Sequence, residues 1–101
     1  MTISPHMATP IANMKLFCRV FGILETSGES LEMKPWAKAA LQWCIRTHGA
    51  PFVDALEAAA HRGLSPLDFI CRCHELSQYL SWEDFLFAEQ TAAAAKRRVM
   101  I

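Results

Sequence analysis

Prolines recur at near-regular intervals along this chain and mark where its helices begin. Pro35, Pro51 and Pro66 lie 16 and 15 residues apart, and Ser81 opens a further helical pattern 15 residues after Pro66. Proline is favoured at the first position of a helix, because its φ is already helical and the N–H that it lacks would have no partner there. The spacing therefore predicts short helices joined by tight connections.

Glycines and small polar residues mark the remaining helix ends. Gly28, Gly49 and Gly63 follow apolar segments, at the place where a left-handed residue commonly closes a helix. Ser65 and Ser81 precede helical patterns and are expected to act as N-caps. No strand-like alternation is present, so we predict an all-α fold, a compact bundle of about five short helices with no sheet. The expected helices span about 10–25, 35–47, 51–62, 66 onward, and 82 to the basic cluster 96–98.

Length and composition bound the organisation of the chain. Its 101 residues are enough for one domain with a modest core. We predict a flexible N-terminal arm over residues 1–8, which lack apolar periodicity, and a single helical domain over residues 9–101. Hydrophobic residues make up 52% of the chain, which favours an apolar surface for self-association or for a partner. The alternative is an alanine-rich helical composition around an ordinary core.

The apolar arcs of the first two helices are wide. At about 100° per residue, the first helix spreads its large apolar side chains over roughly 180° and the second over roughly 200°. Such arcs predict burial from two sides, either by neighbouring helices of the same chain or by another molecule. The residues are Leu16, Phe17, Val20, Phe21, Ile23 and Leu24 in the first helix, and Trp36, Ala37, Ala40, Leu41, Trp43, Cys44 and Ile45 in the second.

Charge and hydropathy argue against two classes of partner. Ten basic residues balance ten acidic residues, so nothing favours direct binding to nucleic acid or to an anionic membrane. No apolar segment is long enough to span a bilayer, and the N-terminus does not resemble a secretory signal. We therefore expect a cytoplasmic protein whose four cysteines are reduced and mostly buried.

The sequence carries no recognisable catalytic or metal-binding motif. Cys71 and Cys73 are two residues apart on a predicted helix, where they point in nearly opposite directions and cannot bind one ion together. Cys73 falls within an apolar face and is expected to fill core space. The histidines are scattered, and no nucleophile motif or phosphate-binding loop is present. We expect no enzyme activity, no small-molecule substrate, and no catalytic, cofactor or metal site.

Residues 55–74 have the spacing of a helix-turn-helix motif. Ala59 and Gly63 match its small-residue pattern, and the segment 64–66 makes a plausible turn. The second helix, however, would begin with the exposed side chains of Leu67, Asp68 and Phe69. Base readers such as Arg, Asn or Gln would be needed there, so the pattern argues against DNA binding.

Aromatic residues crowd the start of the last helix. Trp82 and Phe85 share a face with Leu86, whereas Phe87 lies about 140° from Trp82 around the helix and cannot reach the same core. Either two surfaces pack against this helix or Phe87 is exposed. Large exposed aromatic residues are typical anchors of protein interfaces.

Three stretches cover most of the helical chain: IANMKLFCRVFGILE (11–25), PWAKAALQWCIRTHG (35–49) and SWEDFLFAEQ (81–90). In these stretches the chain resembles the QslA family of bacterial quorum-sensing antiactivators. The resemblance implies a cytoplasmic helical homodimer that regulates transcription. Such a protein binds the ligand-binding domain of a LuxR-type activator such as LasR, disrupts its dimerisation and prevents it from binding DNA.

An inhibitor of this kind needs an apolar patch on rigid helices to replace the contacts between two activator subunits. The protein-interface residues that we predict are Phe17, Phe21, Trp82, Phe85 and Phe87. Two other functions remain open: a phage-type inhibitor of a host protein complex, and a small helix-turn-helix DNA-binding regulator.

Overall fold

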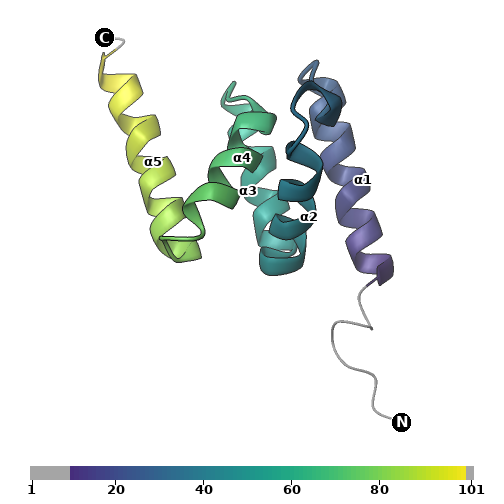
Figure 1. Cartoon of the computed structure of the whole chain (residues 1–101). Coiled ribbons are helices and arrows are strands. Elements are labelled where there is room, and N and C mark those ends of the chain that lie inside the picture. Colours follow the sequence, from purple (N-terminus) through teal and green to yellow (C-terminus); the bar gives the residue numbers. More distant parts are fainter. Residues whose placement is uncertain (1–9, 100–101) are drawn as a thin grey trace.

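The structure, a computed structural model, describes the backbone of residues 10–99 and the side chains of residues 12–91. Within this range the chain forms five α-helices and one short 3-10 helix, with no strand (Figure 1). They are α1 (Pro10–Thr26), η1 (Leu31–Met33), α2 (Ala37–His48), α3 (Ala50–His61), α4 (Pro66–Leu76) and α5 (Trp82–Val99). The predicted all-α bundle is confirmed, and the predicted arm over residues 1–8 lies outside the described residues.

Three helix starts were predicted correctly, at Pro10, Pro66 and Trp82, and local capping explains the last two. The Ser65 hydroxyl accepts the backbone N–H of Asp68 at 3.2 Å, and α4 begins at Pro66. In the same way the Ser81 hydroxyl accepts the N–H of Asp84 at 3.1 Å at the start of α5. Both serines satisfy a donor that the helix itself leaves without a partner.

The other two predicted starts are displaced. Pro35 lies in a turn closed by the N–H of Ala37, which donates to the Lys34 carbonyl at 3.0 Å, so α2 begins two residues later than predicted. Gly49 ends α2 and also precedes α3, which begins one residue earlier than predicted, at Ala50. The φ of Gly49 is +66°, a conformation that other residues rarely adopt. The reversal between the two helices therefore depends on this glycine.

The core lies among α2, α3 and α4, with α1 on one side and α5 on the other (Figure 1). The central position of α2 accounts for most of its wide apolar arc, because the chain's own helices cover it from several sides. Trp36 precedes α2 and is exposed, and Trp43 is half-buried. The fully buried residues of α2 are Ala37, Ala40, Leu41, Cys44 and Ile45.

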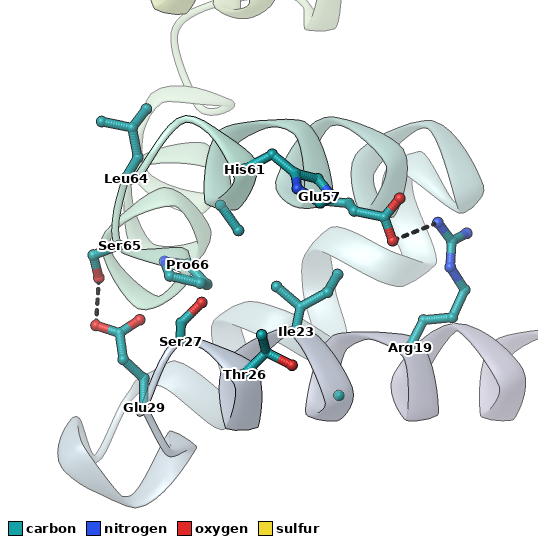
Figure 2. A pocket seen from close by; sticks show the side chains of 13 residues that line it. Arg19, Ile23, Thr26, Ser27, Glu29, Glu57, His61, Leu64, Ser65 and Pro66 are labelled. Carbon is teal, nitrogen blue, oxygen red and sulfur yellow. Dashed lines mark hydrogen bonds and ion pairs between the residues drawn. The ribbon is translucent and has the colours of Figure 1, made fainter.

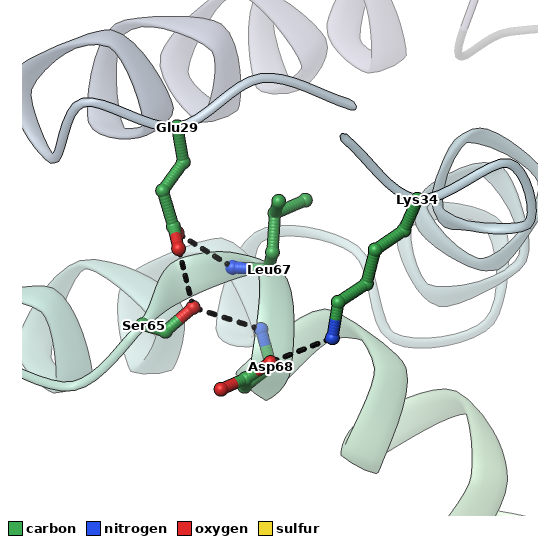
Figure 3. A network of polar contacts seen from close by, with 5 residues as sticks. All are labelled: Glu29, Lys34, Ser65, Leu67 and Asp68. Atoms are coloured by element: carbon green, nitrogen blue, oxygen red, sulfur yellow. Dashed lines mark hydrogen bonds and ion pairs between the residues drawn. The ribbon is translucent and has the colours of Figure 1, made fainter. Parts of the chain in front are cut away.

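A polar network fastens the loop after α1 to the start of α4 (Figure 3). The Glu29 carboxylate accepts the backbone N–H of Leu67 at 3.1 Å and the hydroxyl of Ser65 at 2.6 Å. Beside it, the Lys34 ammonium lies 2.8 Å from the Asp68 carboxylate. Hydrogen bonding to Lys34 lowers the pKa of Asp68, and hydrogen bonding to Asp68 raises the pKa of Lys34. The N-terminus of α4 is thus capped by a carboxylate that lies 38 residues from Leu67 in the sequence.

Candidate protein-binding surfaces

Large hydrophobic side chains are exposed on several helices of the described chain. Exposed aromatic residues and methionines are enriched in protein interfaces relative to the rest of a protein surface. Two of them, Phe21 on α1 and Phe87 on α5, were predicted to contact a partner, and they are 49% and 72% exposed. The full set is Met14, Phe21, Met33, Trp36, Tyr79 and Phe87.

One surface is a strip along α1, formed by Met14, Phe17, Cys18 and Phe21. These residues follow the i, i+3, i+4, i+7 spacing that places side chains on one side of a helix. Met14, Cys18 and Phe21 are exposed, whereas Phe17 is half-buried with its ring centroid 6.4 Å from that of Phe21. We call these four residues the α1 strip. Phe17 and Phe21 were predicted as interface residues, and Met14 and Cys18 share their side of the helix by the same helical spacing.

The second surface is the outer side of α5, which carries Phe87. Phe85, two residues earlier, is fully buried, with its ring centroid 5.5 Å from that of Phe69 on α4. The prediction that Phe85 contacts a partner is therefore wrong, because its side of α5 faces the core. Trp82 is half-buried and also packs against the core. Of the three aromatic residues predicted on α5, only Phe87 is available to a partner.

Trp82, in the first turn of α5, belongs to a cluster of two tryptophans and two histidines. The His48 ring lies 4.6 Å from the Trp82 ring and 5.7 Å from the Trp43 ring, between centroids. Trp43 also meets His74 edge-on at 5.3 Å. Burial lowers the pKa of His48, whose Nε2 lies 3.2 Å from the Ser77 hydroxyl. Sequence reasoning missed this cluster because its members come from α2, α4 and α5 and share no motif.

A bidentate ion pair holds the next turn of α5. The Arg72 guanidinium donates to both carboxylate oxygens of Glu89, at 2.9 and 3.1 Å, and the Glu89 side chain is only 12% exposed. Two parallel charge-assisted hydrogen bonds fix the relative orientation of the two side chains as well as the distance between them. Further along its length, α5 leans away from the other helices (Figure 1).

The predicted interface residues therefore form two surfaces. α1 and α5 lie on opposite sides of the three central helices (Figure 1). Phe17 and Phe21 belong to one surface and Phe87 to the other. One partner surface that combines all five predicted residues is not present in this structure.

A groove of about 780 Å³ lies between α1, α3 and the start of α4 (Figure 2). The Arg19–Glu57 ion pair, at 3.8 Å, lies at one end, and the Glu29–Ser65 hydrogen bond lies at the other. Arg19 also pairs with Asp54 at 3.0 Å. The charged groups of the groove thus hold the helices together.

The cysteines occupy different environments. Cys44 and Cys73 are buried, Cys71 is half-buried and Cys18 is exposed. The expected core position of Cys73 is confirmed. Hydrogen bonding to Cys73 and burial raise the pKa of Cys44, which disfavours its reactive thiolate form. Among the described residues, no three His, Cys, Asp or Glu side chains are grouped in a way that suits a metal ion.

The start of α4 differs from the helix-turn-helix expectation. Leu67 and Phe69 are buried in the core, so the prediction that they are exposed is wrong. Asp68 alone is exposed, and it pairs with Lys34. The first turn of α4 presents a carboxylate to solvent, where a recognition helix would need base-reading side chains.

Comparison with known proteins adds no relative. No protein-family model matches the chain, and no curated protein or solved structure shows a significant match. No described helix combines the length and the apolar character needed to cross a membrane.

Proposed function

We propose that this protein is a small regulatory protein that binds and inhibits another protein. The observation that carries the proposal is Phe87, which is 72% exposed on a helix whose first two turns are tightly held. Burying a phenylalanine side chain contributes about 1.5–3 kcal/mol to association. A preformed aromatic residue on a fixed helix loses little conformational entropy on binding, which favours its use as an anchor.

The partner that we propose is the ligand-binding domain of a LuxR-type transcriptional activator, as in the quorum-sensing antiactivators that the sequence resembles. Such an activator binds DNA as a dimer, and its subunits associate through an apolar surface. The protein would cover that surface with the outer side of α5 and so prevent the activator from binding its operator. The proposal includes a cytoplasmic location and a homodimer as the active form.

The equal numbers of acidic and basic residues support this mode of inhibition. Inhibitors that imitate nucleic acid carry strong negative charge, which this chain lacks. A neutral protein with exposed aromatic side chains is better suited to occupy an apolar surface of a protein.

The test is release of a LuxR-type activator from its operator. A purified LasR-like activator is bound to fluorescently labelled operator DNA, and the anisotropy is followed as this protein is added. We expect wild-type protein to release the DNA and Phe87→Ala to need at least about tenfold more protein. Trp36→Ala is the matched control, because Trp36 is also exposed but lies at the start of α2.

Two outcomes would contradict the proposal. If the activator stays bound to its operator at all concentrations of wild-type protein, the proposed partner is wrong. If Phe87→Ala releases the DNA as well as wild type does, the outer side of α5 is not the inhibitory surface.

A further inference from the structure

We propose that the groove between α1, α3 and the start of α4 binds an extended segment of another protein that carries an arginine between apolar residues. The site is separate from the outer side of α5, and it does not depend on the partner proposed above. The volume of the groove, about 780 Å³, lies within the range of about 300–1,000 Å³ that is typical of ligand pockets.

The charged side chains of the groove leave an excess of negative charge. The Arg19 guanidinium is shared between the carboxylates of Asp54, at 3.0 Å, and Glu57, at 3.8 Å. At the other end of the groove, the Glu29 carboxylate accepts hydrogen bonds from a hydroxyl and a backbone N–H, and neither donor is charged. With His61 counted as neutral at pH 7, the groove therefore favours a cationic ligand.

The backbone adds to this negative potential. The helices α1 and α3 run in the same direction along the groove, and their last residues, Thr26 and His61, both line it (Figure 2). The C-terminus of a helix carries a partial negative charge, which a nearby cation stabilises. The last turn of α1 contains no basic residue that could supply this cation. A positively charged side chain of a partner would supply it.

Glu29 can accept the hydrogen bonds of an arginine. Its half-buried carboxylate lines the groove, and each of its two oxygens accepts one hydrogen bond from the start of α4. A carboxylate has about four acceptor positions, so each oxygen can accept a further N–H. A guanidinium can donate to both oxygens at once, whereas an ammonium is a single point of charge. The groove therefore favours arginine over lysine.

Gly22 leaves the middle of the groove open to a polypeptide backbone. It lies inside α1, where glycine is destabilising relative to alanine, and a Cβ there would meet nothing within 4 Å. Packing within the described chain does not account for this glycine, whereas a backbone lying against α1 would. From Arg19 to Thr26, α1 rises about 10 Å, which about three extended residues span. Ile23 and Leu64 offer apolar contacts to the residues that flank the arginine.

The test is a titration of the full-length protein with the peptide acetyl-Leu-Arg-Leu-amide, followed by two-dimensional NMR of the backbone N–H groups. We expect saturable shifts of the signals of Gly22, Ser27 and Gly63 at up to about 10 mM peptide. A matched peptide carries citrulline, the neutral analogue of arginine, and should bind at least about tenfold more weakly. Acetyl-arginine-amide lacks the apolar neighbours and should also bind more weakly than the full peptide.

Variants of the protein locate the site. Glu29→Gln removes the charge but keeps an oxygen acceptor for α4, and it should weaken binding of the arginine peptide at least about tenfold. Gly22→Leu fills the groove and should abolish binding at an unchanged or higher melting temperature. Glu83→Gln removes an exposed carboxylate on α5 and is the matched control. This control and Phe87→Ala should both bind the peptide as wild type does.

Several results would overturn the inference. They are the absence of saturable shifts at the groove, equal affinity for the arginine and citrulline peptides, and normal binding by Gly22→Leu. If acetyl-arginine-amide binds as tightly as the full peptide, the groove holds a small cation, and a peptide occupant is contradicted. In each of these cases, release of a LuxR-type activator by the Phe87 surface remains a separate result.

Discussion

Phe85 and Phe87 have opposite environments although only two residues separate them. On a helix, side chains two positions apart point about 200° away from each other. Phe85 packs against Phe69 and Trp82 and is fully buried, whereas Phe87 faces solvent. The same residue type therefore supports the fold at one position and is free for a partner at the other.

Replacing each phenylalanine by alanine separates the two roles. Phe85→Ala leaves a cavity and is expected to lower the free energy of unfolding by about 3–5 kcal/mol. Phe87→Ala removes an exposed side chain and should change it by less than about 0.5 kcal/mol. Urea denaturation followed by circular dichroism measures both. Equal losses would show that Phe87 belongs to the core.

The environments of Phe85 and Phe87 can be predicted from the sequence only in part. Helical spacing correctly separates Phe87 from the face of Trp82 and Phe85. It does not show which face the chain itself covers, because Phe69 and His48 reach α5 only through the tertiary fold. For the same reason Leu67 was predicted to be exposed and is buried.

At the scale of single elements, α4 and α5 are fixed by contacts that cross the chain. Glu29 caps α4 from the loop after α1, and His48 of α2 stacks on the first turn of α5. The helix starts at Pro66 and Trp82 could be predicted because their caps, Ser65 and Ser81, are local in sequence. The cap that Glu29 provides to α4 could not be predicted, because no sequence pattern links Glu29 to Leu67.

Removing the tertiary cap should loosen α4. Glu29→Ala leaves the Leu67 N–H without its carboxylate and is expected to cost about 1–2 kcal/mol of stability. Glu29→Gln keeps an oxygen acceptor and should cost less. Chemical denaturation of both variants measures the difference, and an alanine variant as stable as wild type would mean that the cap contributes nothing.

The docking of α5 should weaken in mild acid. Burial lowers the pKa of His48 below its ordinary value of 6.5, so the folded protein holds this ring neutral while the unfolded chain takes up a proton. Stability contributed by the neutral ring is therefore present above pH 6.5 and is lost as the pH falls towards the lowered pKa.

His48→Phe tests this dependence because it keeps an aromatic ring beside Trp82 but cannot be protonated. The measurement is urea denaturation at about pH 7.5 and about pH 5.5, followed by tryptophan fluorescence. Wild-type protein should lose more stability between the two values than the variant does. An identical loss in both proteins would show that His48 is not the responsible group.

At the scale of the whole molecule, the excess of apolar residues is divided between one core and two outer surfaces. The wide arc of α2 is covered by the chain's own helices, as expected for a central helix. The apolar arc of α1 is not fully covered, because Phe21 is exposed. The helix α5, which carries the exposed Phe87, lies on the opposite side of the bundle from α1 (Figure 1). A molecule with two separate apolar surfaces can associate with itself and with a target at the same time.

The distribution of apolar residues between the core and the two outer surfaces can be predicted from the sequence only in part. Hydrophobic content indicates that apolar surface remains outside a small core. It does not show that Phe17 and Phe21 lie far from Phe87, because that depends on the order in which the helices pack. The two-surface arrangement emerges only from the positions of α1 and α5 around the central helices.

The most direct test of the proposed function is the affinity of this protein for the isolated ligand-binding domain of a LuxR-type activator. Isothermal titration calorimetry with wild-type protein and with Phe87→Ala gives both dissociation constants, and melting temperatures confirm that both proteins are folded. We predict binding by wild type and at least tenfold weaker binding by Phe87→Ala at an unchanged melting temperature. Absence of binding by wild type, or equal affinity of the two proteins, would contradict inhibition through the outer side of α5.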